Sequence, residues 1–433
     1  MNAGLGCIAD DFTGAADLAA LLARSGAQVN LRIGIPEKEA LPRADCEVIA
    51  LKCRTIDRRS AVAEARQAFD WLKASGVSKF FWKYCSTFDS TPKGNIGPIA
   101  EALMSDLGAS QTIYCPAFPE NGRSVFMGHL FVGRQLLSES PLKDHPLTPM
   151  RDSCLLRLLE PQVDGAVALI DRNTISLGPD AVREKLKELR NKNVANVIMD
   201  AIVPADLQVI AEACHDMPLL TGGSAIAEPL PKLMGMDSLK PAASGPCQVP
   251  RTDRKAVVLS GSCSEMSNLQ VETYLKTGVP SYRLDPVEIS KHGPGEVLAW
   301  LRRQDFCVAP LIYATAEPDR VRQAQSRLGP VRAGELVEQA ISDCAVAARE
   351  IGVGRIVVAG GETSGAVTKA LNVTKLQVGP EIAAGVPWCF SRDADQSIAL
   401  ALKSGNFGTQ TFFSEALGLL DGGKAGLPDE GGV

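Results

Sequence analysis

Short apolar runs alternate along the chain with longer stretches in which apolar residues recur at helical spacing. The first apolar run covers residues 5–9, and a helix is predicted from there to Gly26, a residue type typical of helix C-caps. The pattern repeats with a strand at 46–53 and a helix over 60–73, whose apolar residues fall on one face. Strands that alternate with helices in this way predict a parallel sheet that is covered on both faces.

The same alternation extends through most of the sequence. Further strands are predicted at 28–33, 79–84, 112–115, 166–170, 194–199, 219–220, 256–259, 355–359 and 397–402, and further helices near 96, over 265–276 and up to 371. The fold class that this pattern indicates is α/β, with mainly parallel sheets.

A change of composition in the middle of the chain predicts two domains. A chain of 433 residues exceeds the size at which a single hydrophobic core stops growing. Residues 240–250 hold three prolines among small polar residues, as linkers between domains often do. We expect domains at 1–240 and 255–420, a linker at 241–254 and a flexible, Gly-rich tail at 421–433.

Composition and charge exclude several classes of protein. The formal net charge of −5 argues against a nucleic-acid partner, and no apolar run approaches the roughly 20 residues that span a membrane. The N-terminus lacks a basic segment followed by an apolar core, so we expect no export and a cytoplasmic location. Twelve cysteines without a CxxC pair, and four scattered histidines, indicate reduced thiols rather than a zinc site.

Two adjacent acids, Asp10 and Asp11, lie where the first strand meets the first helix. In open α/β sheets this position faces the ligand crevice. Capping the helix needs only one acid, so the pair followed by Thr13 favours a binding or catalytic site. Because side chains alternate along a strand, one carboxylate is expected to face the crevice and the other to cap the helix or orient the first. Asp11, nearer the turn, is favoured for contact with the reacting group, although the turn geometry leaves the reverse assignment open.

Four cations lie in or beside the polar segments that follow predicted strands: Arg54, Lys83, Lys93 and Arg123. Taken singly, each is more simply explained as a solvated surface charge. Their shared placement at strand ends, among Ser, Thr and Asn residues, instead suits a small, oxygen-rich anion such as a sugar acid.

Three glycine-containing turns follow strands of the second half, at 260–264, 360–366 and 403–408. Small residues in such turns let backbone N–H groups approach phosphate oxygens, and Glu362 or Thr363 can help to hold magnesium or cap the helix. Neither a GxxxxGKS/T loop nor a GxGxxG turn occurs, so the usual signs of a P-loop or dinucleotide fold are missing. A polar-metabolite site facing a nucleotide site suggests phosphoryl transfer in the cleft between two domains.

Several motifs resemble those of the four-carbon acid sugar kinase family. They are IADDFTGA at 8–15, DSTPKGN at 89–95, PAFP at 116–119 with the later Gly122-Arg123 and Gly128-His129, and GGET at 360–363. Longer strings at 83–91, 115–132 and 144–150 resemble the 3-oxo-tetronate kinase branch of that family. The resemblance covers nearly the whole chain. One departure is Lys93, where much of the family has arginine, and a lysine cannot make the bidentate contact of an arginine.

The resemblance implies ATP-dependent phosphorylation of the terminal (4-) hydroxyl of a four-carbon sugar acid, most closely 3-oxo-tetronate. It also implies an N-terminal domain that binds the acid and a C-terminal domain that binds ATP, with Mg²⁺ expected but its ligands unknown. The implied nucleotide contacts are Ser260, Gly360, Gly361, Glu362, Thr363 and Gly405. The implied substrate contacts are Asp10, Asp11, Arg54, Lys83, Asp89, Ser90, Lys93 and Arg123. The resemblance does not say which carboxylate is the base.

Other functions stay open at this point. One is a threonate or erythronate kinase of the same family, and another is a non-catalytic protein that binds sugar acids. A dehydrogenase would need a GxGxxG turn, which the chain lacks. The oligomeric state is also open, with a homodimer as one expectation.

Overall fold

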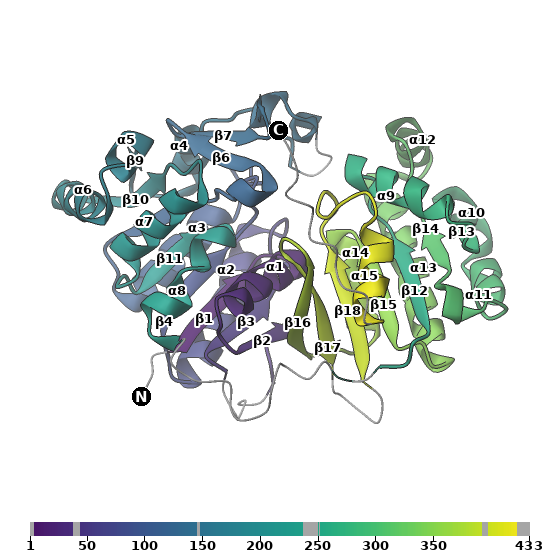
Figure 1. Cartoon of the computed structure of the whole chain (residues 1–433). Coiled ribbons are helices and arrows are strands. Elements are labelled where there is room, and N and C mark those ends of the chain that lie inside the picture. Colours follow the sequence, from purple (N-terminus) through teal and green to yellow (C-terminus); the bar gives the residue numbers. More distant parts are fainter. Residues whose placement is uncertain are drawn as a thin grey trace, which may run out of the picture. The chain divides into compact units, whose positions relative to one another are not determined.

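The computed structural model describes residues 4–37, 44–144, 148–236, 250, 252–391 and 397–421. The chain divides into two compact units, Met1–Gln248 with Thr374–Val378, and Val249–Val373 with Gly379–Val433 (Figure 1). Most of the expected linker at 241–254 and nearly all of the expected tail at 421–433 lie outside the described residues.

The first unit is built on a parallel sheet with the strand order β2-β3-β1-β4-β11-β5-β10-β9. These strands are β1 (Gly4–Ala9), β2 (Val29–Ile33), β3 (Cys46–Ala50), β4 (Val77–Lys83), β5 (Thr112–Cys115), β9 (Ala166–Ile170), β10 (Val194–Met199) and β11 (Leu219–Gly222). Every strand predicted for this half of the chain is therefore confirmed, within a few residues of its expected bounds. β3 is buried along its whole length, as is typical of a parallel strand with helices on both faces.

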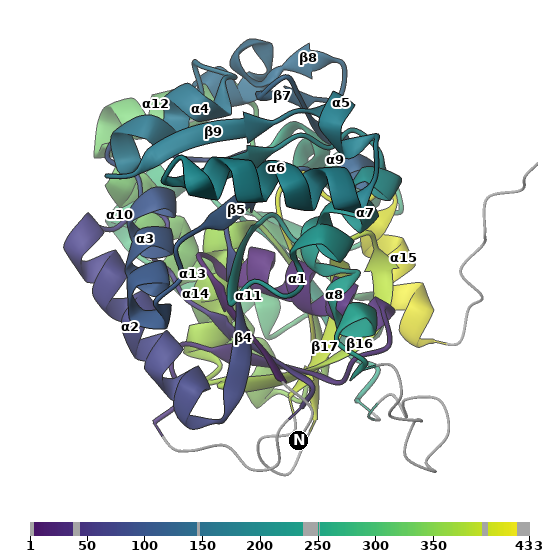
Figure 2. The same ribbon diagram turned by 90° about the vertical axis from the view of Figure 1, so that its left-hand side faces the viewer.

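The helices of this unit follow the strands along the chain. The longer ones are α1 (Phe12–Arg24), α2 (Arg58–Ala74), α3 (Ile96–Leu107), α6 (Pro179–Asn191) and α7 (Pro204–Cys214), and the short ones are α4 (Leu155–Leu159), α5 (Arg172–Ile175) and α8 (Leu230–Leu233). Figure 2 shows α2 and α3 on one side of β4, and α1 and α8 on the other. The predicted covering of both faces is thus confirmed.

A small antiparallel sheet, which the sequence pattern did not predict, stands beside the main one. It consists of β6 (Arg123–Phe126), β7 (His129–Val132) and β8 (Gln135–Leu136). The carboxylate of Asp200, just past β10, accepts hydrogen bonds from the N–H groups of Met127 and Gly128 at 2.7 and 2.9 Å. The turn between β6 and β7 is therefore tied to the end of β10, the neighbour of the edge strand β9.

The second unit also has a mainly parallel sheet. Its strands β13-β14-β12-β15-β18 are parallel neighbours in that order, and β17 adds antiparallel to β18. The strands are β12 (Ala256–Ser260), β13 (Ser281–Arg283), β14 (Leu311–Tyr313), β15 (Arg355–Ala359), β16 (Lys375–Ala383), β17 (Val386–Ser391) and β18 (Ile398–Lys403). The three strands predicted for this half correspond to β12, β15 and β18 and are confirmed. The first residues of β16 pair antiparallel with β2, so this segment belongs to the first unit.

The helices of the second unit are α9 (Glu265–Leu275), α10 (Pro286–His292), α11 (Gly295–Leu301), α12 (Pro318–Leu328), α13 (Pro330–Glu350), α14 (Gly361–Ala370) and α15 (Phe412–Leu420). A core around Trp388 joins side chains of the sheet to apolar residues of α9 and α15, among them Tyr274 and Phe413. Within the described residues, no helix is both long enough and apolar enough to cross a membrane.

Candidate active site

Three adjacent strands of the first unit end at one place and bring the predicted polar residues together. In the order β3-β1-β4, Ala9 is in register with Ala50 on one side and with Lys83 on the other. The N–H of Asp10 donates to the carbonyl of Lys83 at 3.0 Å. The segments that carry Asp10, Arg54 and Lys83 therefore leave the sheet side by side, at the edge where open α/β sheets bind ligands.

The guanidinium of Arg54 lies among three carboxylates. Its Nε and Nη2 donate to the two oxygens of Asp10 at 2.7 and 2.9 Å, and Nη2 is also 2.8 Å from Oδ1 of Asp11. Nη1 lies 3.7 Å from Oδ2 of Asp89. Of the two adjacent acids, Asp11 caps α1, as was expected of one of them, but both carboxylates contact Arg54. β1 ends at Ala9, so both acids belong to the turn, where the alternation of a strand does not apply.

Asp11 is the N-cap of α1. Its Oδ1 accepts a hydrogen bond from the N–H of Gly14 at 3.0 Å, and its Oδ2 accepts one from the hydroxyl of Thr13 at 2.9 Å. Burial by itself raises the pKa of Asp11, but the charges of Arg54 and Lys83 and these hydrogen bonds outweigh it and hold the pKa below its ordinary value. The side chain keeps 20% of its exposure, against 4% for that of Asp10. Of the two, Asp11 is the carboxylate that a ligand can reach.

Lys83 is buried beneath the first turn of α1. Its Nζ donates to the carbonyl of Tyr84 at 2.8 Å. A Cβ atom at Gly14 would lie 2.8 Å from this Nζ and 2.4 Å from Oδ1 of Asp11. Only glycine at position 14 therefore lets the ammonium and the carboxylate approach the helix so closely.

The turn after β4 aims Asp89 at Arg54. The hydroxyl of Thr87 donates to Oδ1 of Asp89 at 2.7 Å. Between them, Phe88 has φ +53, a conformation that is uncommon for a bulky residue. Its ring is fully buried and meets the ring of Tyr84 edge-on at 5.5 Å, which shows what holds the strained backbone in place.

The other predicted substrate contacts differ in their burial and in the residues that they lie next to. Arg123 is half-buried at the start of β6. Burial lowers the pKa of its guanidinium, and the negative charges of Asp17 and Asp89 oppose this shift. Ser90 is buried against Gly94, and Lys93 is exposed. The structure thus gathers Asp10, Asp11, Arg54, Lys83, Asp89 and Arg123, while no hydrogen bond or ion pair between described residues joins the side chain of Ser90 or Lys93 to this group.

Two residues near this group were missed as site residues. The side-chain amide of Asn95 donates to the carbonyls of Cys53 and Ile56 at 2.8 and 2.9 Å and so fixes the turn that carries Arg54. Asp17, on the buried face of α1, accepts a hydrogen bond from the hydroxyl of Ser224. The signal for Asp17 was available in the sequence, because an acid between the apolar residues of a helix is unusual.

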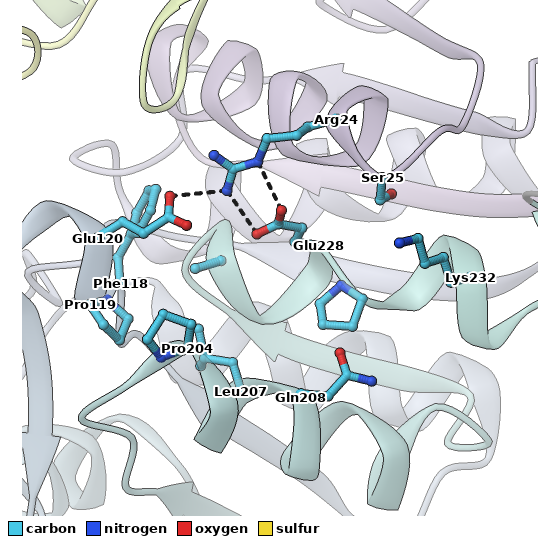
Figure 3. Close-up of a pocket in the computed structure, with 12 residues that line it drawn as sticks. Arg24, Ser25, Phe118, Pro119, Glu120, Pro204, Leu207, Gln208, Glu228 and Lys232 are labelled. Carbon is cyan, nitrogen blue, oxygen red and sulfur yellow. Dashed lines mark hydrogen bonds and ion pairs between the residues drawn. The ribbon is translucent and has the colours of Figure 1, made fainter. Parts of the chain in front are cut away.

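A pocket of about 300 Å³ lies elsewhere in the first unit, next to the segment that follows β5 (Figure 3). Arg24 bridges two acids across it, with Nη2 at 3.0 Å from Glu120 and Nε at 2.8 Å from Glu228. None of the residues around Arg54 lines this pocket. The pocket contains none of the residues predicted to bind the substrate, so we do not assign the sugar acid to it.

The three predicted glycine turns of the second unit meet at the ends of the neighbouring strands β12, β15 and β18. A Cβ atom at Gly261 would lie 2.2 Å from Oγ1 of Thr363, and one at Gly405 would lie 2.7 Å from Oγ of Ser262. Gly360 has φ +122, which residues with a side chain rarely adopt. The three turns therefore lie next to one another at the ends of these strands.

The side chains of these turns differ in how far they are exposed to solvent. Ser260 is fully buried, and its hydroxyl shares a hydrogen bond of 2.7 Å with that of Thr315, a residue that sequence reasoning missed. Thr363 is buried between Gly261 and Gly360, whereas Glu362 is exposed in the first turn of α14. Gly361 is the first residue of that helix, so its N–H is among those without a partner inside the helix.

Comparison with known proteins agrees with this division. A family model described as a sugar-binding N-terminal domain matches residues 5–230, and one described as a nucleotide-binding C-terminal domain matches residues 257–413. The chain is 49% identical to the 3-oxo-tetronate kinase of Pseudomonas fluorescens, over 97% of this chain and 98% of that protein. It is 48% identical to the 3-oxo-tetronate kinase of Burkholderia multivorans, over 96% and 97%. A solved structure from Salmonella typhimurium LT2 matches with a TM-score of 0.82 and 39% identity, over 95% of this chain and 98% of the other.

Proposed function

The chain belongs to the four-carbon acid sugar kinase family, and from this premise we propose that it transfers the γ-phosphoryl group of ATP to the terminal hydroxyl of 3-oxo-tetronate. The product is the 4-phosphate of that acid, and ADP is released. The observation that carries the proposal is the group of acids and cations around Arg54, within a domain of the sugar-binding family. The glycine turns of the second unit support it, because they offer backbone N–H groups suited to phosphate.

For the acid, we assign the cations of the first unit to its carboxylate and hydroxyl oxygens. Arg123 and Lys93 would bind the carboxylate, and Ser90 and Asp89 the hydroxyl groups. Arg54 and Lys83 have a second role, since both act on the carboxylates of Asp10 and Asp11. Their charges lower the pKa of both acids, although burial still leaves the pKa of Asp10 above its ordinary value, and Asp11 stays partly exposed.

For the proton, we assign Asp11 as the acceptor. The terminal hydroxyl must lose its proton as its oxygen bonds to the γ-phosphorus and the bond from that phosphorus to the leaving ADP oxygen breaks. The pKa of Asp11 is held low, so its carboxylate accepts the proton late in the reaction. This timing suits a loose transition state, because the acceptor hydroxyl becomes acidic only as its bond to phosphorus forms. Asp10 is then the supporting acid, linked to Asp11 through Arg54.

For ATP, we assign Ser260, Gly360, Gly361, Glu362, Thr363 and Gly405 to the nucleotide site. The N–H groups at the start of α14 and in the glycine turns would donate to the phosphates. Magnesium neutralises charge on the transferring phosphoryl group when it is bound. The described residues contain no cluster of three metal-binding side chains, which fits an ion held mainly by phosphate oxygens and one or two carboxylates such as Glu362.

Because the transferred group joins the two substrates, the proposal requires the terminal hydroxyl of the acid to reach the γ-phosphorus of ATP. This requirement follows from the chemistry of direct transfer, in which attacking and leaving oxygens lie in line with phosphorus.

The experiment that tests the substrate is a panel of four-carbon acids. Purified protein is given ATP and Mg²⁺ with 3-oxo-tetronate, threonate or erythronate, and ADP release is followed for each. We expect the highest kcat/KM with 3-oxo-tetronate. A higher value with threonate or erythronate would assign the chain to a sister kinase, and ATP binding without ADP release would indicate a non-catalytic binding protein.

A further inference from the structure

The last residue of β18, Lys403, carries a buried ammonium in the second unit. The residue is fully buried, and its Nζ donates to the carbonyls of Ser404 and Gly405 at 2.9 and 2.7 Å. The hydroxyl of Ser267 on α9 lies 3.5 Å from the same Nζ and itself donates to the carbonyl of Gly405 at 2.9 Å. The ammonium is thus surrounded by oxygens of its own turn and of one helix.

No carboxylate compensates this charge within the described residues. The helix α9 presents Ser267, and α15 presents the ring of Phe412, whose centroid is 6.0 Å from Nζ. None of the ion pairs between described residues involves Lys403. Burial lowers the pKa of Lys403 to about 7. A buried cation without a partner is costly, so its presence calls for an explanation beyond packing.

The hydrogen bonds of Lys403 determine how two peptide groups are turned. In a trans peptide the C=O and the N–H point in opposite directions. The carbonyl of Ser404 shares its peptide with the N–H of Gly405, and the carbonyl of Gly405 shares its peptide with the N–H of Asn406. Because both carbonyls point toward the buried Nζ, both N–H groups point away from it.

These two N–H groups have no acceptor among the residues that the structure describes. The rest of the turn is also held by its carbonyls, since the side-chain amide of Gln270 donates to those of Phe407 and Thr409 at 3.0 and 2.7 Å. Gly405 lies against Ser262 and Ser264, so the two N–H groups belong to the place where the three glycine turns meet. Two successive free N–H groups form a concavity that suits an anion.

We propose that Lys403 is a positioning residue of the nucleotide site: it holds the carbonyls of Ser404 and Gly405 inward so that the N–H groups of Gly405 and Asn406 together bind a phosphate of ATP. The inference rests on the proposed function, because it deepens the role of the turn at 404–408. The bound polyphosphate also supplies the negative charge that the buried ammonium lacks. Nucleotide and Lys403 therefore stabilise each other.

The test compares Lys403→Met with the full-length wild-type protein and with a control, Lys276→Met. Lys276 is an exposed lysine of the same unit, with its ammonium 2.8 Å from Glu272. Calorimetry with Mg·ADP should show a dissociation constant raised about 10- to 100-fold in Lys403→Met, the range for lost charge-assisted hydrogen bonds, and unchanged in Lys276→Met. The KM for the acid should stay within about twofold in both, because the acid binds in the other domain.

A second readout separates positioning from a merely structural role. At about pH 8 the free protein holds Lys403 largely neutral, and a bound anion raises its pKa, so wild-type protein should take up protons on binding ADP. The uptake is measured by calorimetry in buffers of different ionisation enthalpy. It should persist in Lys276→Met and vanish in Lys403→Met.

If Lys403→Met does not fold, the same measurement is made on Ser267→Ala. This variant keeps the ammonium of Lys403 but removes the hydroxyl that donates to the carbonyl of Gly405. It should weaken ADP binding severalfold. Wild-type affinity in a folded Lys403→Met, or in Ser267→Ala when the first variant does not fold, would overturn the inference. Absence of nucleotide binding by the wild-type protein would instead overturn the proposed function.

Discussion

Arg54 binds both oxygens of Asp10, at 2.7 and 2.9 Å, while the same Nη2 lies 2.8 Å from Asp11. One guanidinium therefore couples a buried acid to a partly exposed one. The bidentate pair fixes the plane of Arg54, and this in turn fixes where the carboxylate of Asp11 can lie. Of these two coupled acids, Asp11 is the one that a ligand can reach, and its orientation is already set.

Asp11→Asn should lower kcat by about 10²- to 10⁴-fold, the usual range for loss of a general base. Asparagine is also a good N-cap, so α1 should persist and the KM for ATP should stay near the wild-type value. Steady-state kinetics with both substrates measure this. Asp57→Asn is the control, since Asp57 caps α2 at the surface in the same way, through the N–H of Ser60 at 3.0 Å. A near-normal kcat for Asp11→Asn would turn attention to Asp10 or Asp89 as the base.

Arg54→Ala and Arg123→Ala test the cations of the first unit, and Arg54→Ala also tests the contribution of its ion pairs to stability. Removing one partner of a buried ion pair costs about 3–5 kcal/mol, and the cost for Arg54 should be smaller because its side chain keeps 24% of its exposure. Both variants should raise the KM for the acid more than that for ATP, and Arg54→Ala should also lower the melting temperature by several degrees. Thermal unfolding and kinetics together check this. A loss of ATP affinity alone in both variants would mean that the cations of the first unit do not bind the acid.

Gly14→Ala should impair catalysis although alanine favours helices. The added Cβ would meet Oδ1 of Asp11 at 2.4 Å and Nζ of Lys83 at 2.8 Å, so one of these charged groups must move. We expect kcat to fall at least tenfold, because small displacements of a catalytic group are costly. Gly418→Ala in α15 is the control: its Cβ would meet nothing within 4 Å, and activity should be unchanged. Equal activity in the two variants would show that the position of Asp11 is not critical.

Gly360→Ala should weaken nucleotide binding. Gly360 has φ +122, a conformation that residues with a side chain rarely adopt. An added Cβ would lie 2.9 Å from Oγ1 of Thr363 and 3.2 Å from the N of Ser262, so it would push the glycine turns apart. Gly278→Ala shares the strain of a positive φ, at +79, but its Cβ would meet no neighbour within 4 Å. Calorimetry with ADP should therefore show a large loss of affinity in the first variant and none in the second. Intact affinity in a folded Gly360→Ala would count against the nucleotide site.

The stability that Asp11 contributes should depend on pH. Its pKa is lower in the folded than in the unfolded chain, so the folded state binds fewer protons and the contribution is complete above the ordinary carboxyl value of about 3.9. It is lost as the pH falls through the lowered folded value. The difference in melting temperature between wild-type protein and Asp11→Asn should thus be full at about pH 7 and shrink below about pH 4. A difference that stays constant into acid would show that no such ionised contact exists.

Local sequence patterns predicted the strands and their polar ends, because burial on both faces and turn residues leave a clear signal. They placed Asp10, Arg54 and Lys83 at one edge without showing that Arg54 binds both acids, since this depends on where β1 ends. The pairing of β16 with β2 joins residues far apart in sequence, and no local pattern reports such a contact. Lys403 was read only as part of a glycine turn, because nothing in the string KSGNFG says that the ammonium points inward.

Transfer of the phosphoryl group to the terminal hydroxyl can be followed directly by ³¹P NMR of the reaction. Purified protein, ATP, Mg²⁺ and 3-oxo-tetronate are mixed, with Asp11→Asn in a parallel sample. We expect the ATP signals to give way to those of ADP and of an equal amount of a phosphate monoester. The phosphorus of that ester should couple to the two protons of a terminal methylene group, and the ester should form far more slowly in the variant. The proposed transfer would be contradicted by release of inorganic phosphate alone, by an ester at another carbon, or by unchanged ATP.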